Sequence, residues 1–236
     1  MRALSALLAC WMVGSGAANA QEFRVDGRIA NRHAADVPYA ITTPFPGQFR
    51  FEVRPGDQWS VDRKSGTGAE RAELSLDKDP VRIDVRYRVS YEIGIEQGAP
   101  ADSTWLVLGQ WHATEDKGDA PSSPPLAFEL SGDDLVIYTQ ATSEPRHTKN
   151  PPPVERARVP GIARDRWYRI EYDVLFNPSH GDLAVRIDGQ PVFAGEIPIG
   201  YADAVGPYFK FGIYRSKSAE RFAVRFRNIL IGVLPR

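Results

Sequence analysis

Apolar and polar residues alternate with a period of two along most of this chain, and this pattern predicts β-strands. In "YFKFGIYR" (208–215) the odd-numbered residues are apolar up to Ile213, whereas Tyr208, Lys210 and Tyr214 occupy the other face. Comparable patterns predict strands at 48–54, 70–76, 81–96, 104–112, 126–130, 134–140, 166–176, 182–188 and 221–233. One face of each strand would therefore meet a core, and the other would meet solvent or a ligand.

Short turn sequences separate these strands, among them "SGDD" (131–134), "NPSHGD" (177–182) and "DGQP" (188–191). No segment shows a long helical period. The sequence therefore predicts an all-β fold, an antiparallel β-sandwich of two sheets of the jelly-roll type. We see no internal repeat or boundary, and expect a single domain over residues 21–236.

The first twenty residues, "MRALSALLACWMVGSGAANA", have the features of a secretory signal peptide. A basic residue, Arg2, precedes an apolar run, and Ala18-Asn19-Ala20 forms a cleavage site. We therefore expect residues 1–20 to be removed after Ala20 and the protein to be secreted or periplasmic. Cys10 is the single cysteine and would leave with this segment, so the mature chain would have no disulfide or cysteine metal site.

Composition and charge exclude some classes of partner. The chain has 236 residues, 42% of them hydrophobic, which is enough to build one sizeable core. Removing Arg2 leaves 28 basic and 30 acidic residues, a net charge of −2. The chain therefore lacks the positive field typical of nucleic-acid binding, and we expect a monomer with no nucleic-acid or membrane partner.

One segment, 143–166, departs from the strand pattern because it holds five prolines and many basic residues. It predicts a long loop. Two interpretations remain open: a solvated excursion, or a basic flap over an anionic ligand. His147 lies in this segment, and we assign no role to it, to His33 or to His180.

Three predicted strands each carry an apolar face and a face of chemically specific groups. Arg71 and Glu73 share a face of "ERAELSL" (70–76), and Gln110 and His112 share a face of "LGQWH" (108–112). Taken singly, each has an ordinary structural explanation, such as a cross-strand ion pair. If these strands are neighbours of 208–215, their polar faces line one groove.

These groups fit β-elimination on a polyuronate. The C5 proton of a uronic acid becomes acidic only when its carboxylate is neutralised, and Arg71 and Gln110 can supply donors for this. His112 and Tyr214 can share the removal of that proton and the protonation of the leaving oxygen. Positive charge from Arg71 or Lys210 is expected to lower the pKa of Tyr214 from about 10. No metal or cofactor is required.

The stretches "RAEL" (71–74), "QWH" (110–112) and "YFKFGIYR" resemble the motifs of jelly-roll polysaccharide lyases. The Trp in "QWH" is closer to the heparin lyase I and glucuronan lyase group, which is related to the alginate lyases. The resemblance implies a concanavalin A-like sandwich, with Tyr214 as acid and also a candidate base. It further implies His112 as base or its partner, and Gln110 and Arg71 as the groups that neutralise the carboxylate.

The same resemblance implies substrate contacts and a substrate class. Lys210 is expected to bind substrate or tune the tyrosine, and Glu73, Tyr208 and Arg215 are expected as further substrate contacts. Ser75 and Arg215 depart from the alginate-lyase pattern, which favours the glucuronan and heparin-lyase-like group. The expected partner is thus an anionic polysaccharide: glucuronan, alginate or a heparin-like polymer.

Two other functions remain open. A glycoside hydrolase on the same fold would need two closely spaced carboxyl groups, and "ELSLDKD" (73–79) has the wrong spacing for them. A non-catalytic carbohydrate-binding protein would need aromatic platforms, which Trp59, Trp105 and Trp167 could supply.

Overall fold

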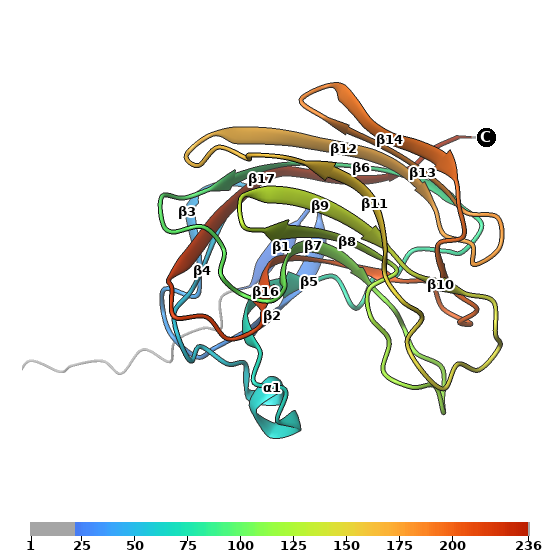
Figure 1. Cartoon of the computed structure of the whole chain (residues 1–236), viewed down its shortest axis with the longest axis horizontal. Coiled ribbons are helices and arrows are strands. Elements are labelled where there is room, and N and C mark those ends of the chain that lie inside the picture. Colours follow the sequence, from blue (N-terminus) through green and yellow to red (C-terminus); the bar gives the residue numbers. More distant parts are fainter. Residues whose placement is uncertain (1–21, 236) are drawn as a thin grey trace, which may run out of the picture.

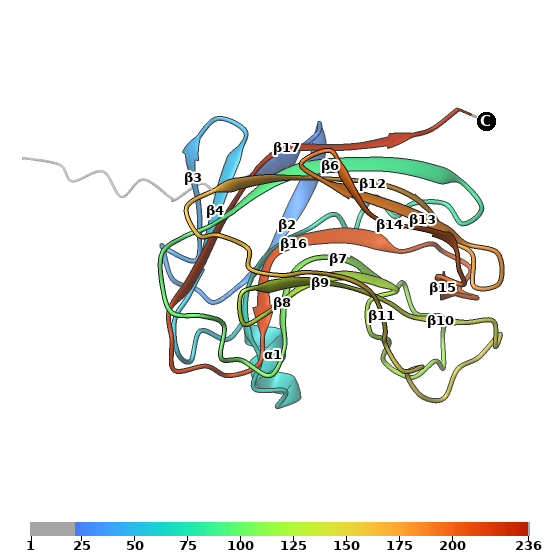
Figure 2. The same cartoon turned by 45° about the horizontal axis from the view of Figure 1, so that its top comes forward.

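Two antiparallel sheets packed face to face make up the protein. The computed structural model describes residues 22–235, so the expected signal peptide and its cleavage site lie outside the described residues. In Figure 1 the eight-stranded sheet lies below the seven-stranded sheet, and Figure 2 shows the same two layers from a second angle. The predicted all-β antiparallel sandwich is confirmed. Among residues 22–235, no helix has the length and apolar character needed to cross a membrane.

The eight-stranded sheet carries the motifs identified in the sequence. Its strands, in spatial order, are β1 (Phe23–Val25), β2 (Arg28–Ala34), β5 (Glu70–Ser75), β16 (Tyr208–Arg215), β7 (Leu106–His112), β8 (Leu126–Ser131), β9 (Asp134–Thr139) and β11 (Val154–Val159).

The seven-stranded sheet covers the other side of the core. Its strands, in spatial order, are β14 (Gln190–Glu196), β13 (Asp182–Ile187), β12 (Trp167–Leu175), β6 (Arg86–Ile95), β17 (Phe222–Val233), β4 (Gln48–Val53) and β3 (Ile41–Phe45). A short parallel pair, β10 (Ala141–Thr142) and β15 (Gly200–Tyr201), and one helix, α1 (Ser60–Ser65), lie outside the two sheets.

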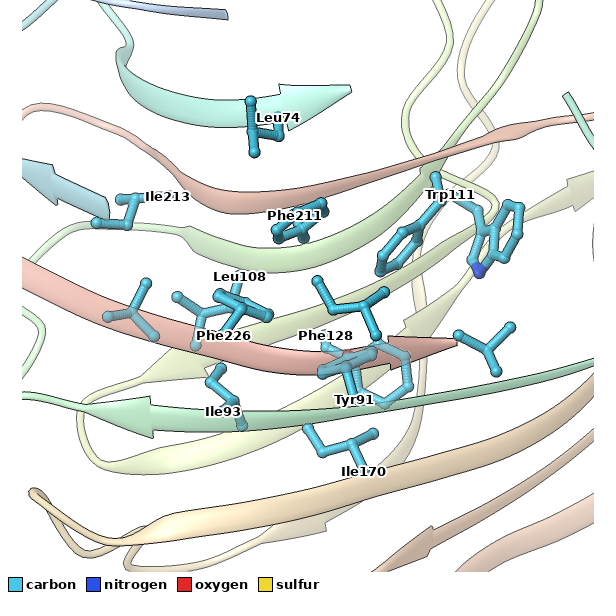
Figure 3. Close-up of a cluster of buried hydrophobic side chains, with 14 of the residues drawn as sticks. Leu74, Tyr91, Ile93, Leu108, Trp111, Phe128, Ile170, Phe211, Ile213 and Phe226 are labelled. Atoms are coloured by element: carbon cyan, nitrogen blue, oxygen red, sulfur yellow. The ribbon is translucent and has the colours of Figure 1, made fainter. Parts of the chain in front are cut away.

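Alternating apolar residues from both sheets meet in one core. Leu74 and Phe211 from the eight-stranded sheet belong to the same buried cluster as Ile93 and Phe226 from the seven-stranded sheet (Figure 3). Phe211 is fully buried and packs at an angle against Phe226, with ring centroids 5.3 Å apart. Each such side chain contributes about 1.5–3 kcal/mol by leaving water. The core fixes which face of β16 points away from it.

The three motif strands are neighbours, as a common groove requires. β16 lies between β5 and β7, and Lys210 pairs with Ser75 on one side and with Gln110 on the other. Tyr214 is opposite Arg71 on β5. The polar faces of β5, β16 and β7 therefore form one continuous surface.

Three local features differ from the sequence-based expectation. The strand predicted at 81–96 begins only at Arg86, because Asp84 adopts a left-handed backbone with φ of 61°. The predicted loop 143–166 contains β11, which extends the sheet beside β9. Helix α1 was not predicted, since six residues are too few to show a helical period.

Gly212 has a different role from the one its position in the motif indicates. A glycine in a strand can mark the close approach of a ligand to the backbone. Here φ is 133°, and a Cβ atom would lie 2.3 Å from the Ala72 carbonyl oxygen and 2.8 Å from the Phe51 ring. Glycine is therefore required by a bulge in β16 and by packing toward the core.

Candidate active site

A buried network of charged groups forms the floor of the polar face. One Glu73 oxygen is 2.7 Å from Nη1 of Arg71 and 2.8 Å from Nζ of Lys210. The Gln110 amide donates a 2.5 Å hydrogen bond to the other oxygen. All four side chains are nearly inaccessible to solvent. Glu73 thus ties together the predicted groups of β5, β16 and β7.

Helix α1 completes this network from outside the sheet. Its Asp62 accepts two hydrogen bonds from Arg71, at 2.7 and 2.9 Å. With Glu73 this occupies three of the five N–H donors of the guanidinium, so two remain for a ligand. Two buried cations and two buried anions balance, which allows the network to stay charged away from water.

Charge pairing sets the protonation states of the floor. Burial alone would raise the pKa of Glu73, but Lys210 and Arg71 outweigh it and hold that pKa at about 2. Burial lowers the pKa of Lys210, while Glu73 acts in the opposite direction. The ionised Glu73 therefore fixes Arg71, Lys210 and the Gln110 amide in place.

Tyr214 lies over this floor. The Arg71 guanidinium is 3.6 Å from the centroid of its ring, and the Trp105 ring is 4.5 Å from it on another side. Burial raises the pKa of Tyr214, and the positive charge of Arg71 reduces this rise without reversing it. The expectation that Arg71 or Lys210 would lower this pKa below 10 was wrong, because burial outweighs the positive charge of Arg71, and Asp62 and Glu73 raise the pKa further. Tyr214 is thus a protonated phenol at neutral pH.

His112 lies on the same polar face, beside the opposite end of β16 from Tyr214. It pairs with Tyr208 across β7 and β16, and the two rings stack with centroids 5.1 Å apart. Its Nδ1 lies 2.8 Å from the carbonyl oxygen of Ala113, which fixes the proton on Nδ1 and leaves a lone pair on Nε2. Burial and the nearby Lys210 lower its pKa. His112 is therefore a neutral imidazole at neutral pH.

Lys210 and Gln110, which pair across β16 and β7, lie between His112 and Tyr214 on this face. A sugar ring bound over Lys210 and Gln110 would have a neutral imidazole on one side and a phenol on the other. Tyr208 extends the row beside His112, and its own pKa is raised by burial and by nearby carboxylates.

Two predicted substrate contacts are placed differently. Arg215 follows Tyr214 and so points to the opposite face, where it is 2% exposed and pairs with Glu70 at 2.7 Å. It stabilises the fold and does not join the groove. Glu73 is 1% exposed and fully engaged by protein donors, so it supports the site from below.

Sequence reasoning assigned no role to His33, offered Trp59 only as an aromatic platform and did not single out Asp62. His33 is opposite Glu73 on the neighbouring strand β2 and stacks on Trp59, with centroids 4.2 Å apart. Burial and the charge of Lys210 lower its pKa to about 4. The alternating pattern of β2 could have identified His33, because His33 and Ala34 lie on opposite faces of their strand, as His112 and Trp111 do on β7.

A cavity of about 430 Å³ borders the groove at Tyr214. Trp105 and Tyr214 line it together with Pro153 from the loop before β11. Glu129 is the one carboxyl group among the described residues that line it, and burial raises its pKa to about 7. This part of the groove is therefore apolar and, at neutral pH, only partly charged.

The basic segment 143–166 does not present all its charges to the groove. Arg158 pairs with Glu155 and Asp134, and Arg156 donates to the Thr139 hydroxyl. His147 is buried. Much of the positive charge of this segment is thus used within the fold.

Comparison with known proteins identifies the family. Residues 22–229 match the family model described as polysaccharide lyase. The structure resembles an endo-β-1,4-glucuronan lyase from the fungus Trichoderma reesei, with a TM-score of 0.66 and 12% identity over 93% of each chain. It also resembles alginate lyase A1-II′ of polysaccharide lyase family 7, with a TM-score of 0.63 and 14% identity over 85% of this chain and 86% of that one. Comparison with curated proteins gave no match. At such identities the structural likeness confirms the jelly-roll fold.

Proposed function

Because this chain belongs to the polysaccharide lyase family, we propose that it cleaves a uronic-acid-containing polysaccharide by β-elimination, with its active site on the polar face of β5, β16 and β7. The observation that carries this proposal is the buried network under Tyr214. A fixed guanidinium, ammonium and amide together suit a substrate carboxylate, whose charge must be neutralised before C5 loses its proton.

The directions of the pKa shifts favour a division of roles. Nε2 of the neutral His112 takes the C5 proton, while the protonated Tyr214 gives its phenolic proton to the leaving glycosidic oxygen. The C4–O4 bond breaks as the C4–C5 double bond forms. Transfer of a proton from His112 back to the Tyr214 phenolate, through solvent, restores the enzyme. Gln110 and the remaining N–H groups of Arg71 hold the carboxylate.

The substrate class is tested by ultraviolet absorbance during incubation with separate polymers: glucuronan, polymannuronate, polyguluronate, heparin, hyaluronan and a neutral glucan. β-Elimination creates a conjugated unsaturated uronate that absorbs where the intact polymer does not. We expect a rise with one or more polyuronates and none with the neutral glucan.

Two other results would contradict the proposal and indicate a different function. New reducing ends without absorbance would indicate hydrolysis, although the cavity offers Glu129 as its only described carboxyl group and hydrolysis needs two. Binding of an acidic polymer without either product would indicate a carbohydrate-binding protein that uses Trp59 and Trp105 as platforms.

The pH dependence of kcat/KM should show the lowered pKa of His112. We expect kcat/KM to stay near its maximum as pH falls through 6.5 and to decline only below it, because the imidazole must be neutral to accept a proton. The alkaline side of the kcat profile should stay flat to about pH 10, since the pKa of Tyr214 is raised. A pH profile measured on a soluble polyuronate checks both limbs, and an acid limb centred above pH 6.5 would argue against His112 as base.

Glu129 should weaken binding of a polyanion at alkaline pH. Its carboxyl group is neutral below a pKa of about 7 and charged above it, so KM for a polyuronate should rise several-fold between pH 6 and 8.5. In Glu129→Gln this rise should disappear while kcat changes little. Glu155→Gln, which removes a charge from the edge strand β11 on the far side of β9, serves as control. An equal KM dependence in Glu129→Gln and wild type would contradict this role.

We further propose that residues 21–236 form one secreted or periplasmic lyase domain that acts as a monomer. The signal-like sequence of residues 1–20 supports export. N-terminal sequencing of the exported protein tests cleavage after Ala20, and its mass in solution tests the oligomeric state.

A further inference from the structure

A second cluster of chemically reactive groups lies among the loops that border the groove. Side-chain ligand atoms of Asp119, His147 and Asp203 all lie within 4.8 Å of one another. Nδ1 of His147 is 3.7 Å from an Asp119 oxygen, and both side chains are 97% buried, being 3% exposed. The three residues come from loops that are far apart in the sequence, so the fold itself assembles the cluster.

The hydrogen bonds around His147 define which of its nitrogens is available. Nε2 of His147 lies 2.7 Å from the Ser122 hydroxyl oxygen, which also lies 3.4 Å from the Ala120 carbonyl oxygen, so Ser122 can accept from Nε2–H and donate its own proton to Ala120. In that arrangement a neutral imidazole has its lone pair on Nδ1, facing Asp119. A lone pair and a carboxylate repel each other unless a cation lies between them. A hydrogen bond to the distal nitrogen is also the usual way in which proteins orient a metal-binding histidine.

Asp203 provides an independent sign of a missing counter-charge. It is 9% exposed, yet within residues 22–235 no hydrogen bond or ion pair ends on its carboxylate. Asp116 and Asp119 add further negative charge nearby. Buried carboxylates are normally paired or bound to a metal. Asp203 points toward the other two groups without a protein partner of its own.

We propose that Asp119, His147 and Asp203 form a binding site for a divalent transition-metal ion, for which Zn²⁺ is the closest match. One imidazole nitrogen and two carboxylates are a donor set typical of Zn²⁺, whereas Ca²⁺ prefers oxygen ligands alone. Three protein ligands leave room for water on the ion. No role in the elimination is required of it.

The ion would stabilise the position of one wall of the groove. His147 stacks on Tyr201, with centroids 5.1 Å apart, and the Tyr201 hydroxyl donates to the Ser123 carbonyl oxygen. Ser123 lines the cavity beside Tyr214. The site thus joins the loop before β8, the loop before β11 and the segment after β15. Through His147, Tyr201 and Ser123 it would hold the cavity wall in place.

The test is metal binding by the whole protein after chelation and dialysis. We expect calorimetry to show one Zn²⁺ per chain, and the thermal midpoint to rise by roughly 5–10 °C when Zn²⁺ is a hundredfold above Kd. Asp203→Asn should weaken Zn²⁺ binding at least about tenfold. Asp116→Asn removes the same charge from the same neighbourhood without removing a proposed ligand, and should weaken binding by at most a few-fold.

Three results would overturn the site: no Zn²⁺ binding by wild type, equal losses in Asp203→Asn and Asp116→Asn, or Zn²⁺ binding that is as tight in His147→Gln as in wild type. The last result would show that the imidazole is not a ligand. If Asp203→Asn fails to fold, Asp119→Asn carries the same comparison.

Discussion

Replacing Tyr214 with phenylalanine is expected to lower kcat by about 10²–10⁴-fold, because the leaving glycosidic oxygen then has no proton donor. The ring of Phe would keep the contact with the Arg71 guanidinium and with Trp105, so the fold and the groove should be unchanged. Affinity for the polymer should therefore stay within a few-fold of wild type. Initial rates by ultraviolet absorbance and binding to immobilised polymer measure the two effects separately.

Tyr208→Phe is the matched comparison, since Tyr208 lies on the same face of the same strand. It should change KM more than kcat, because its expected role is to bind substrate beside His112. Similar losses of kcat in both variants would show that the assignment of the proton donor is wrong.

Glu73→Gln is expected to reduce the free energy of unfolding by about 3–5 kcal/mol, the usual cost of leaving a buried charge unpaired. The substitution preserves shape but leaves Lys210, which is 2% exposed, without its anion. The Gln110 amide would also lose its charged acceptor, so activity should be lost as well. Urea unfolding at pH 7 measures the change in stability.

Two variants sharpen this prediction. Adding Lys210→Met to Glu73→Gln removes the stranded cation and should recover part of the stability. Glu70→Gln breaks a separate buried pair, with Arg215, and should destabilise the fold while leaving kcat per folded molecule near wild type. A loss below about 1 kcal/mol in Glu73→Gln would contradict the importance of the network.

The stability that Glu73 contributes should also depend on pH. Its folded-state pKa, about 2, lies below the value near 4.5 that it has when unfolded, so its contribution is complete above pH 4.5. The contribution should be lost as pH falls from there toward 2. Wild type and Glu73→Gln should accordingly converge in stability in acid.

Alternation was sufficient to predict the faces of β5, β16 and β7, because a strand has only two. It placed Tyr214 and Lys210 together on one face and the Phe residues of β16 on the core face. The partners across space could not be predicted in this way. Asp62 comes from a helix too short to have a period, and nothing in its neighbourhood marks it as the partner of Arg71.

The sequence also could not distinguish a charged side chain that faces the groove from one that forms an ion pair inside the fold. Arg215 stands next to Tyr214 in the motif, but its partner Glu70 is distant in the chain and its face is the opposite one. The pKa of Tyr214 was misjudged for the same reason. Counting nearby cations is insufficient when burial raises the pKa and the Asp62 and Glu73 carboxylates add to that rise.

The position of β16 between β5 and β7 has a consequence for how the protein is made. Residues 208–215 come about a hundred residues or more after the strands that they separate, which begin at residues 70 and 106. Until the ribosome has released them, β5 and β7 each carry an unpaired edge, and the two halves of the groove floor have nothing between them. The groove floor is therefore absent from the nascent chain until residues 208–215 have been made and inserted between β5 and β7.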